Sequence, residues 1–161
     1  MCCTDAAPQP VLQRVQSDKH WIYGRAEMAP FAISRALLAR VDKEIYAIPL
    51  THVLETFSLS QPMLLESKGR QVVAIRDDLF TAIWLRERVG LPPAAIAGSG
   101  QVVLIELAER KAALIVDAFI GQQEIVVKQF DGVNGSKTLF SGATILGDGS
   151  PALIVDASSL L

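Results

Sequence analysis

Residues 36–50 read ALLARVDKEIYAIPL, which is two apolar runs on either side of the polar triplet Asp42-Lys43-Glu44. The runs are four to six residues of largely apolar character, the length and texture of short strands rather than of a helix. A short polar connection between two such runs is typical of a β-hairpin. The stretch therefore predicts two paired strands at residues 36–41 and 45–50.

The same texture recurs along the rest of the chain. Further apolar, strand-like runs are joined by short polar or glycine-containing turns, and Arg86 to Val89 and residues 157–161 suggest single helical turns. The glycines of Gly147-Asp148-Gly149 permit the positive φ of a tight turn. The runs lie at residues 53–57, 71–75, 79–85, 102–107, 111–116, 124–127, 143–146 and 152–155.

Two of these runs match later runs at nearly the same distance along the chain. Residues 45–48 correspond to 113–116 at an offset of 68, and residues 82–85 correspond to 152–155 at an offset of 70. Similar offsets at two separated places indicate a duplicated unit. Many short strands with tight turns favour barrels, because closure removes the unpaired edges of a sheet. We therefore expect an all-β chain of two small barrels.

The expected domain limits follow from composition. Residues 1–29 contain Pro8 and Pro10 and no sustained period, which predicts a tail or lead-in before the ordered part at 30–161. Residues 94–100 are small and include two glycines, as expected of a connection between the two halves. We therefore predict that the two barrel subdomains divide near 94–100.

Composition also limits the classes of partner and location. The 161 residues carry a net charge of −2 and no cluster of lysine and arginine along the chain, which argues against a nucleic-acid partner. Each apolar run is far shorter than the roughly 18 residues that cross a membrane. Cys2 and Cys3 are adjacent and suggest no disulfide framework, which fits a cytoplasmic protein.

Sequence motifs for chemistry are weak, and we predict no catalytic, cofactor-binding or metal-binding residue. His20 and His52, the two histidines, have no partner at a spacing that suggests a triad or a metal site. Asp117 and Asp156 both end a Leu-Ile-Val-Asp string, but they fall at different elements of the repeat. We expect both to be strand-end turn residues whose side chains bond nearby backbone amides.

Five longer strings stand out: SRALLARV at 34–41, YAIPL at 46–50, VLET at 53–56, GQQEIVVK at 121–128 and SGATILGDG at 141–149. Together they resemble the CheW-like family of bacterial chemotaxis, and most closely the C-terminal regulatory domain of the CheA histidine kinase. The resemblance covers about residues 30–161. It implies two five-stranded SH3-like barrels that share a hydrophobic core, with short helical turns.

The resemblance also implies a function without catalysis. Such domains act as adaptors in signal transduction: they join CheA to CheW-like proteins and contact the cytoplasmic tips of chemoreceptors, so a cytoplasmic protein recruited to membrane receptor arrays is expected. Matching the family strings residue by residue places partner-binding positions at Val53, Glu55 and Arg76. An exposed apolar residue beside a charge offers both burial and orientation to a partner.

Alternatives stay open at this point. Arg76 beside Asp77 also fits a solvated turn, and Val53 also fits a core position. A small barrel that binds a ligand or an oligonucleotide, or an uncharacterised β-barrel enzyme, is the competing function. None of the motifs of the other CheA domains is present, so a free-standing CheW-like protein, a divergent coupling protein and a fragment of a larger kinase all fit the sequence.

Overall fold

The computed structural model describes residues 15–17, 20–22, 32–93, 99–129 and 138–161. They fall into two compact units, Met1–Ala32 and Ile33–Leu161, each described by itself. The first unit contains an antiparallel hairpin of β1 (Val15–Ser17) and β2 (His20–Ile22), with Val15 opposite Ile22. The predicted lead-in at 1–29 thus contains a two-stranded ribbon, and its remaining residues lie outside the described part.

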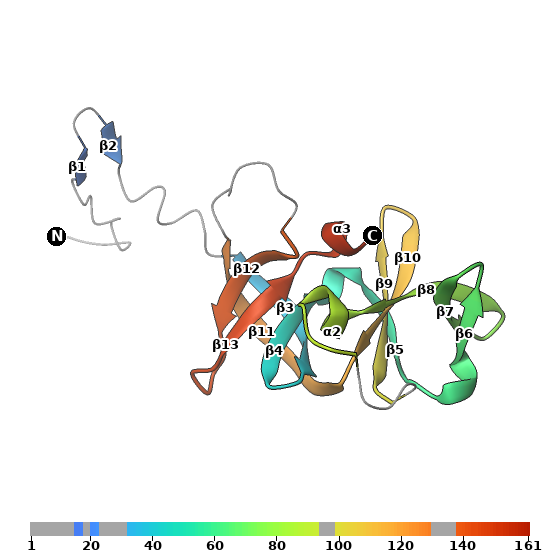
Figure 1. Cartoon of the computed structure of the whole chain (residues 1–161). Coiled ribbons are helices and arrows are strands. Elements are labelled where there is room, and N and C mark those ends of the chain that lie inside the picture. The colour runs from blue at the N-terminus through green and yellow to red at the C-terminus, as the bar shows by residue number, and fades with distance from the viewer. Residues whose placement is uncertain (1–14, 18–19, 23–31, 94–98, 130–137) are drawn as a thin grey trace. The chain divides into compact units, whose positions relative to one another are not determined.

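The second unit begins and ends in a closed five-stranded barrel. Its strands run in the order β11-β12-β13-β4-β3, so the first two strands of the unit join the last three (Figure 1). The bounds are β3 (Ala32–Val41), β4 (Glu44–Pro49), β11 (Ala118–Gln129), β12 (Phe140–Ile145) and β13 (Pro151–Val155).

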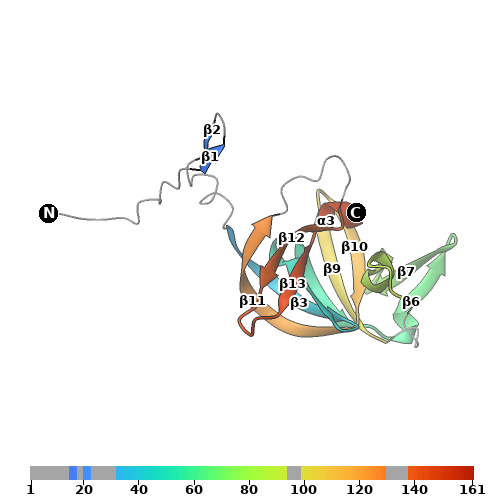
Figure 2. The same ribbon diagram turned by 60° about the vertical axis from the view of Figure 1, so that its left-hand side comes forward.

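The middle of the chain forms a second sheet of six strands in the order β5-β9-β10-β8-β7-β6, and Figure 2 shows it beside the barrel. Its strands are β5 (Val53–Ser58), β6 (Leu64–Ser67), β7 (Arg70–Ile75), β8 (Asp78–Trp84), β9 (Gln101–Leu107) and β10 (Arg110–Val116). The short helices are η1 (Leu50–His52), η2 (Gln61–Met63), α2 (Leu85–Arg88) and α3 (Ala157–Leu160). None of the helices in the described ranges is long and apolar enough to cross a membrane.

The all-β fold and its predicted hairpins are confirmed, including the pair β3 and β4 that the opening stretch predicts. The division near 94–100 needs correction. Residues 94–98 lie outside the described part, but β8 and β9 on either side belong to the same six-stranded sheet. The chain instead changes sheets between β4 and β5 and again between β10 and β11. A composition shift indicates a connection between elements, and it does not say which sheet the next strand joins.

The duplication inferred from the two offsets reappears in the strand registers. In the barrel β4 pairs with β3 antiparallel and with β13 parallel, and in the second sheet β10 pairs with β9 antiparallel and with β8 parallel. Leu153 lies opposite Tyr46, and Ile83 lies opposite Leu114. These four residues are equivalent under the offsets of 68 and 70. A single helical turn, α2 or α3, then follows each of the equivalent strands β8 and β13.

Continuous apolar runs occur where a strand is buried on both faces. On β10, Leu114 faces a core that the barrel and the second sheet share, whereas Ile115 faces a separate core inside the second sheet. On β3, Leu37 faces the shared core and Leu38 faces the barrel interior. The shared hydrophobic core implied by the family resemblance is therefore present. Its buried residues are Leu37, Ala39, Val41, Tyr46, Ile48, Ile83, Leu85, Val103, Ile105, Ala112, Leu114, Val116, Val155 and Leu160.

The buried hydroxyl of Tyr46 makes the folded protein less stable at alkaline pH. Its ring stacks on Phe140 with centroids 5.8 Å apart, and burial, with a smaller effect of Glu44, raises the pKa of the Tyr46 hydroxyl above 10.0. Tyr46 therefore ionises at a lower pH in the unfolded chain than in the folded chain. The stability that its neutral hydroxyl contributes is fully present below pH 10.0 and is lost as pH rises through the higher pKa of the folded state. We expect urea unfolding midpoints of Tyr46→Phe to fall less between pH 9 and 11 than those of the wild type. Equal losses in both proteins would contradict this assignment.

Candidate protein-interaction site

Glu55 and Arg76 form a two-pronged ion pair on the surface of the second sheet. The Nη2 of Arg76 donates to Oε2 of Glu55 at 2.8 Å, and Nη1 donates to Oε1 at 3.3 Å. The guanidinium carbon also lies 5.9 Å from the centre of the Phe57 ring, within range of a cation–π contact. Two hydrogen bonds in parallel fix both the position and the plane of the Arg76 fork.

The curvature of the sheet brings these two side chains together. Glu55 is on β5 at one end of the strand order, and Arg76 is in the turn between β7 and β8, with β9 and β10 between them in the order. Phe57 of β5 and Val73 of β7 pack into the same core, so the ends of the sheet bend toward each other. The sheet thus has the curvature of a barrel with a sixth strand, β6, at its edge.

The backbone at Arg76 has the geometry of a hairpin turn. Its φ is +58°, in the left-handed region that side-chain-bearing residues seldom adopt. The same conformation occurs at non-glycine residues in the β3–β4, β6–β7 and β9–β10 turns, so it reports turn geometry and is no independent sign of a binding site. Within the described ranges, these other residues are Asp42, Lys68, Ala108 and Glu109.

Val53 lies apart from the ion pair. Its half-buried side chain packs against the shared core, where Ile105 is its partner on β9. A bulge between Val53 and Glu55 breaks the strand alternation and leaves Leu54 exposed by 44%. The structure therefore brings Glu55 and Arg76 together, places Val53 against the core, and makes Leu54 the exposed apolar neighbour of the pair.

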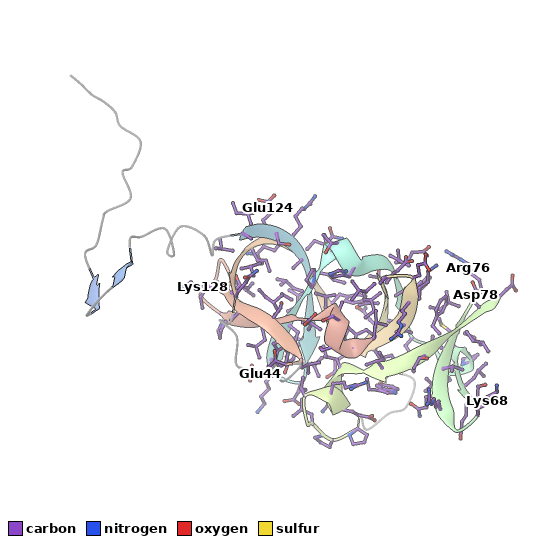
Figure 3. All side chains as sticks on the ribbon, turned by 90° about the horizontal axis from the view of Figure 1, so that it is seen from above. Glu44, Lys68, Arg76, Asp78, Glu124 and Lys128 are labelled. Carbon is purple, nitrogen blue, oxygen red and sulfur yellow. The ribbon has the colours of Figure 1, made fainter. Side chains whose placement is uncertain are left out.

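The ion pair contributes little to folding. The side chains of Arg76 and Glu55 are 71% and 43% exposed, and surface pairs of this kind stabilise by about 0–1 kcal/mol. Leu54 precedes Glu55, and Leu79, three residues after Arg76, is 57% exposed. In Figure 3, Arg76 and Asp78 project from the tip of the β7–β8 hairpin, at the end of the second unit away from Glu124 and Lys128. Fixed charges flanked by exposed leucines can orient and bury a partner.

The described part of the chain offers no metal-binding cluster. No three His, Cys, Asp or Glu side chains within it are close enough to hold an ion. Asp156, expected to be a turn residue, accepts hydrogen bonds from the amide and hydroxyl of Ser158 and caps α3. The expectation for Asp117 needs correction, since its carboxylate accepts from the amide of Asp42, 75 residues away, and pairs with Arg86.

Comparison with known proteins shows which family the sequence belongs to. The sequence model described as "CheW-like domain" matches residues 35–161. The chain belongs to the CheW-like domain family.

Relatives of this CheW-like domain are much longer proteins. It is 37% identical over 131 residues to the "Sensor histidine kinase CheAY" of Helicobacter pylori, and the aligned residues cover 81% of this chain and 16% of that protein. It is 31% identical over 131 residues to "Chemotaxis protein CheA" of Bacillus subtilis, with 81% and 20% covered. It is 36% identical over 131 residues to the CheA of Salmonella typhimurium, with 80% and 20% covered. The chain spans a fifth or less of the length of these relatives.

A solved structure supports the fold. The crystal structure of the scaffolding protein TtCheW from Thermoanaerobacter tengcongensis superposes with a TM-score of 0.58, covering 78% of this chain and 90% of that one. Its sequence identity is 19%, so this likeness concerns the fold alone.

Two of the strings that carry the family resemblance lie side by side in the CheW-like domain. Residues 121–128 lie in β11 and residues 141–149 run from β12 into the next turn, and Lys128 pairs with Ala143. Exposed Val126 and Ile145 project from these strands. Sequence reasoning missed Leu54, Leu79, Val126 and Ile145 as exposed apolar residues, because a bulge or a barrel exterior cannot be read from local composition.

Proposed function

We propose that this CheW-like domain is a non-catalytic adaptor in bacterial chemotaxis. It binds CheA or CheW-like proteins and the cytoplasmic tips of chemoreceptors, and so couples receptor state to the kinase. The proposal places the domain in the cytoplasm, recruited to receptor arrays at the membrane. The family membership and the similarity to CheA chains from three bacteria support it.

The observation that carries the proposal is the Glu55–Arg76 ion pair with its exposed leucine neighbours. The pair is rigidly oriented by two hydrogen bonds, yet its exposure means that folding gains little from it. Fixed charges at a protein surface favour specificity and rapid association with a complementary partner. Glu55 and Arg76 therefore serve as orienting contacts, and Val53 supports β5 from the core side.

The competing functions lack a matching observation in the described residues. Enzymes need a cavity in which nucleophiles, acids or bases converge, whereas an open groove of about 550 Å³ in the second sheet is lined by two arginines, one glutamate, and neutral polar and apolar side chains. An oligonucleotide-binding barrel needs exposed aromatic platforms in a basic channel. Trp84, the aromatic residue that lines the groove, is half-buried and donates its indole N–H to Gln71.

Charge reversal at the pair tests the proposal. We expect Arg76→Glu to weaken binding to CheA, CheW-like and receptor fragments of the same organism at least tenfold, measured by calorimetry, because it places two carboxylates together at the contact. Stability should change by only about 1 kcal/mol, since the pair is exposed. Lys68→Glu is the matched control, because Lys68 is also an exposed cation in a left-handed turn position.

The inverted pair separates a partner contact from a structural role. Glu55→Arg combined with Arg76→Glu restores the internal ion pair but presents the opposite charges to a partner. Binding should therefore stay weak in the double variant while its unfolding midpoint returns to the wild-type value. Full recovery of binding, or no binding of any of these fragments by the wild type, would sink the proposal.

A further inference from the structure

A groove lies along the face of the second sheet that carries Ile83, beside the shared core and α3. It has a volume of about 550 Å³ and adjoins a second hollow of about 340 Å³. The two share Arg70, Thr81, Ile83 and Leu160, so they form one continuous depression between β7, β8 and α3. We call it the arginine groove.

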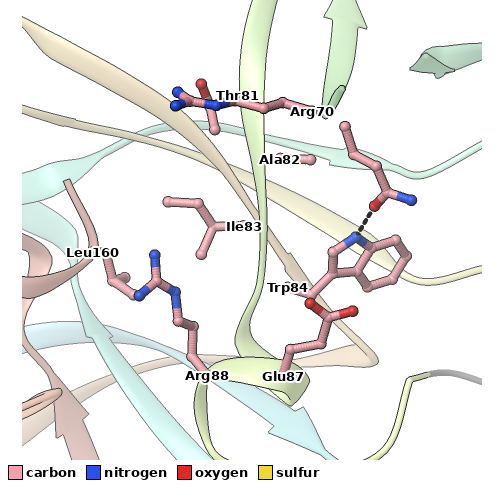
Figure 4. A pocket seen from close by; sticks show the side chains of 9 residues that line it. Arg70, Thr81, Ala82, Ile83, Trp84, Glu87, Arg88 and Leu160 are labelled. Carbon is pink, nitrogen blue, oxygen red and sulfur yellow. Dashed lines mark hydrogen bonds between the residues drawn. The ribbon is translucent and has the colours of Figure 1, made fainter. Parts of the chain in front are cut away.

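Three arginines from distant parts of the chain line the arginine groove. Arg70 begins β7, Arg88 ends α2 and Arg110 begins β10, and one side-chain carboxylate, that of Glu87, lies among the lining residues. Lys111 lies at one end, where Glu106 of β9 is opposite it. In Figure 4, Arg70 and Arg88 reach over the groove on either side of Ile83. The groove is therefore locally cationic in a chain whose net charge is −2.

Folding does not use two of these three charges. Within the described ranges, no carboxylate lies within 4.0 Å of the guanidinium of Arg70 or Arg88, while Arg110 donates to the carbonyl oxygen of Leu161 at 3.1 Å. Arg86, two residues before Arg88 on the same helix, pairs with Asp117 at 2.7 Å and Asp42 at 3.6 Å. The same short helix thus carries one arginine that holds the fold and one that is open to a partner.

Apolar side chains form the floor of the groove and continue beyond it. Ile83 and Leu160 are buried beneath the arginines. Strand pairing places Leu65 opposite Val72, and Val72 opposite Thr81, so these residues share the face that contains Ile83. Leu65 is 45% exposed. A ligand could place apolar groups along this face while its charges meet the arginines.

We propose that the arginine groove binds an acidic peptide segment of a partner protein, with apolar residues between its carboxylates. Arginine forks match carboxylates in planar, two-bond geometry, and here they are spread along a groove rather than gathered around one point. That spacing suits several carboxylates on one chain better than a single phosphate. The groove is separate from the Glu55–Arg76 site: Arg70 and Arg76 stand at opposite ends of β7, about 20 Å apart along the strand.

The test uses the whole chain and a fluorescein-labelled peptide of alternating glutamate and leucine. Anisotropy should reveal saturable, salt-sensitive binding, and Arg70→Glu combined with Arg88→Glu should weaken it at least tenfold. Arg35→Glu is the control: it reverses an exposed arginine on β3 of the barrel, outside both the groove and the Glu55–Arg76 pair, and should leave peptide binding unchanged. Because the adaptor proposal is tested at Arg76 and this one at Arg70 and Arg88, the two proposals can fail separately.

Other ligands are separated by parallel titrations. If inorganic phosphate displaces the peptide when the two are present at similar concentrations, the groove is a small-anion site and the proposal is overturned. Tighter groove-dependent binding of single-stranded oligonucleotides or phosphatidylglycerol vesicles would overturn it too. Equal binding of a lysine–leucine peptide would also overturn the proposal. The proposal would fail as well if the double variant bound the peptide with wild-type affinity while its circular dichroism spectrum was unchanged.

Discussion

Replacing Arg86 by methionine is expected to lower the free energy of unfolding by about 1–3 kcal/mol, because it leaves two partly exposed carboxylates without their cation. The side chain of Arg86 is 17% exposed. Its Nη1 lies 2.7 Å from Asp117, its Nη2 lies 3.6 Å from Asp42, and its Nε donates to the carbonyl of Pro92 at 2.6 Å. Methionine keeps the length and apolar stem of the side chain, so the loss measures the charged head.

The destabilisation should affect the contact between the two sheets, because Arg86 next to one sheet pairs with aspartates at the edge of the other. Arg86 follows β8 of the second sheet, Asp42 is in the β3–β4 turn of the barrel, and Asp117 stands where the chain returns to the barrel. Loosening this contact should expose the shared core. Hydrogen exchange at β3 and β4 is therefore expected to rise along with the fall in the urea midpoint.

Arg88→Met is the matched control for Arg86→Met. It removes a cation from the same helical turn, but Arg88 is exposed and makes no ion pair with any described residue. Its free energy of unfolding should stay within about 0.5 kcal/mol of the wild-type value. Equal destabilisation by the two substitutions would mean that α2 tolerates neither change, and the proposed role of the Arg86 network would be wrong.

The hairpins could be predicted from the sequence because each depends on residues that are close along the chain. The duplication was predictable for a related reason, since the repeated strands β4 and β10 are buried on both faces and therefore read as uninterrupted apolar runs. The exchange of strands between the sheets could not be predicted in this way. It depends on long-range pairing of β4 with β13, which no local pattern encodes.

The candidate site was predictable only in part. Family strings pointed to Val53, Glu55 and Arg76, and the structure joins Glu55 to Arg76, whereas Val53 turns toward the shared core because of the bulge before Glu55. The arginine groove had no sequence signal. Arg70, Arg88 and Arg110 are separated by about 20 residues each, and a count of neighbouring charges therefore misses them.

Gly142→Ala is the second substitution with a large expected effect, a loss of about 3 kcal/mol or more in the free energy of unfolding. Gly142 is on β12, opposite Gln129 of β11 and next to a register irregularity after Phe140. An added Cβ would overlap the carbonyl oxygen of Lys128 and lie 3.2 Å from the Cα of Gln129. Backbone atoms cannot rotate away as a side chain can, so β12 must move off β11.

Gly147→Ala is the control that isolates this clash. Gly147 lies in the turn after β12, and its φ is not in the left-handed region. An added Cβ would meet only the side-chain amide nitrogen of Gln123, at an ordinary contact distance of 3.7 Å. Alanine there should be neutral or slightly stabilising, because it restricts the unfolded chain. Since β11 and β12 are neighbours in a closed barrel, Gly142→Ala should also expose strand edges and promote aggregation in size-exclusion chromatography. A wild-type urea midpoint for Gly142→Ala would mean that the β11–β12 contact is looser than this geometry requires.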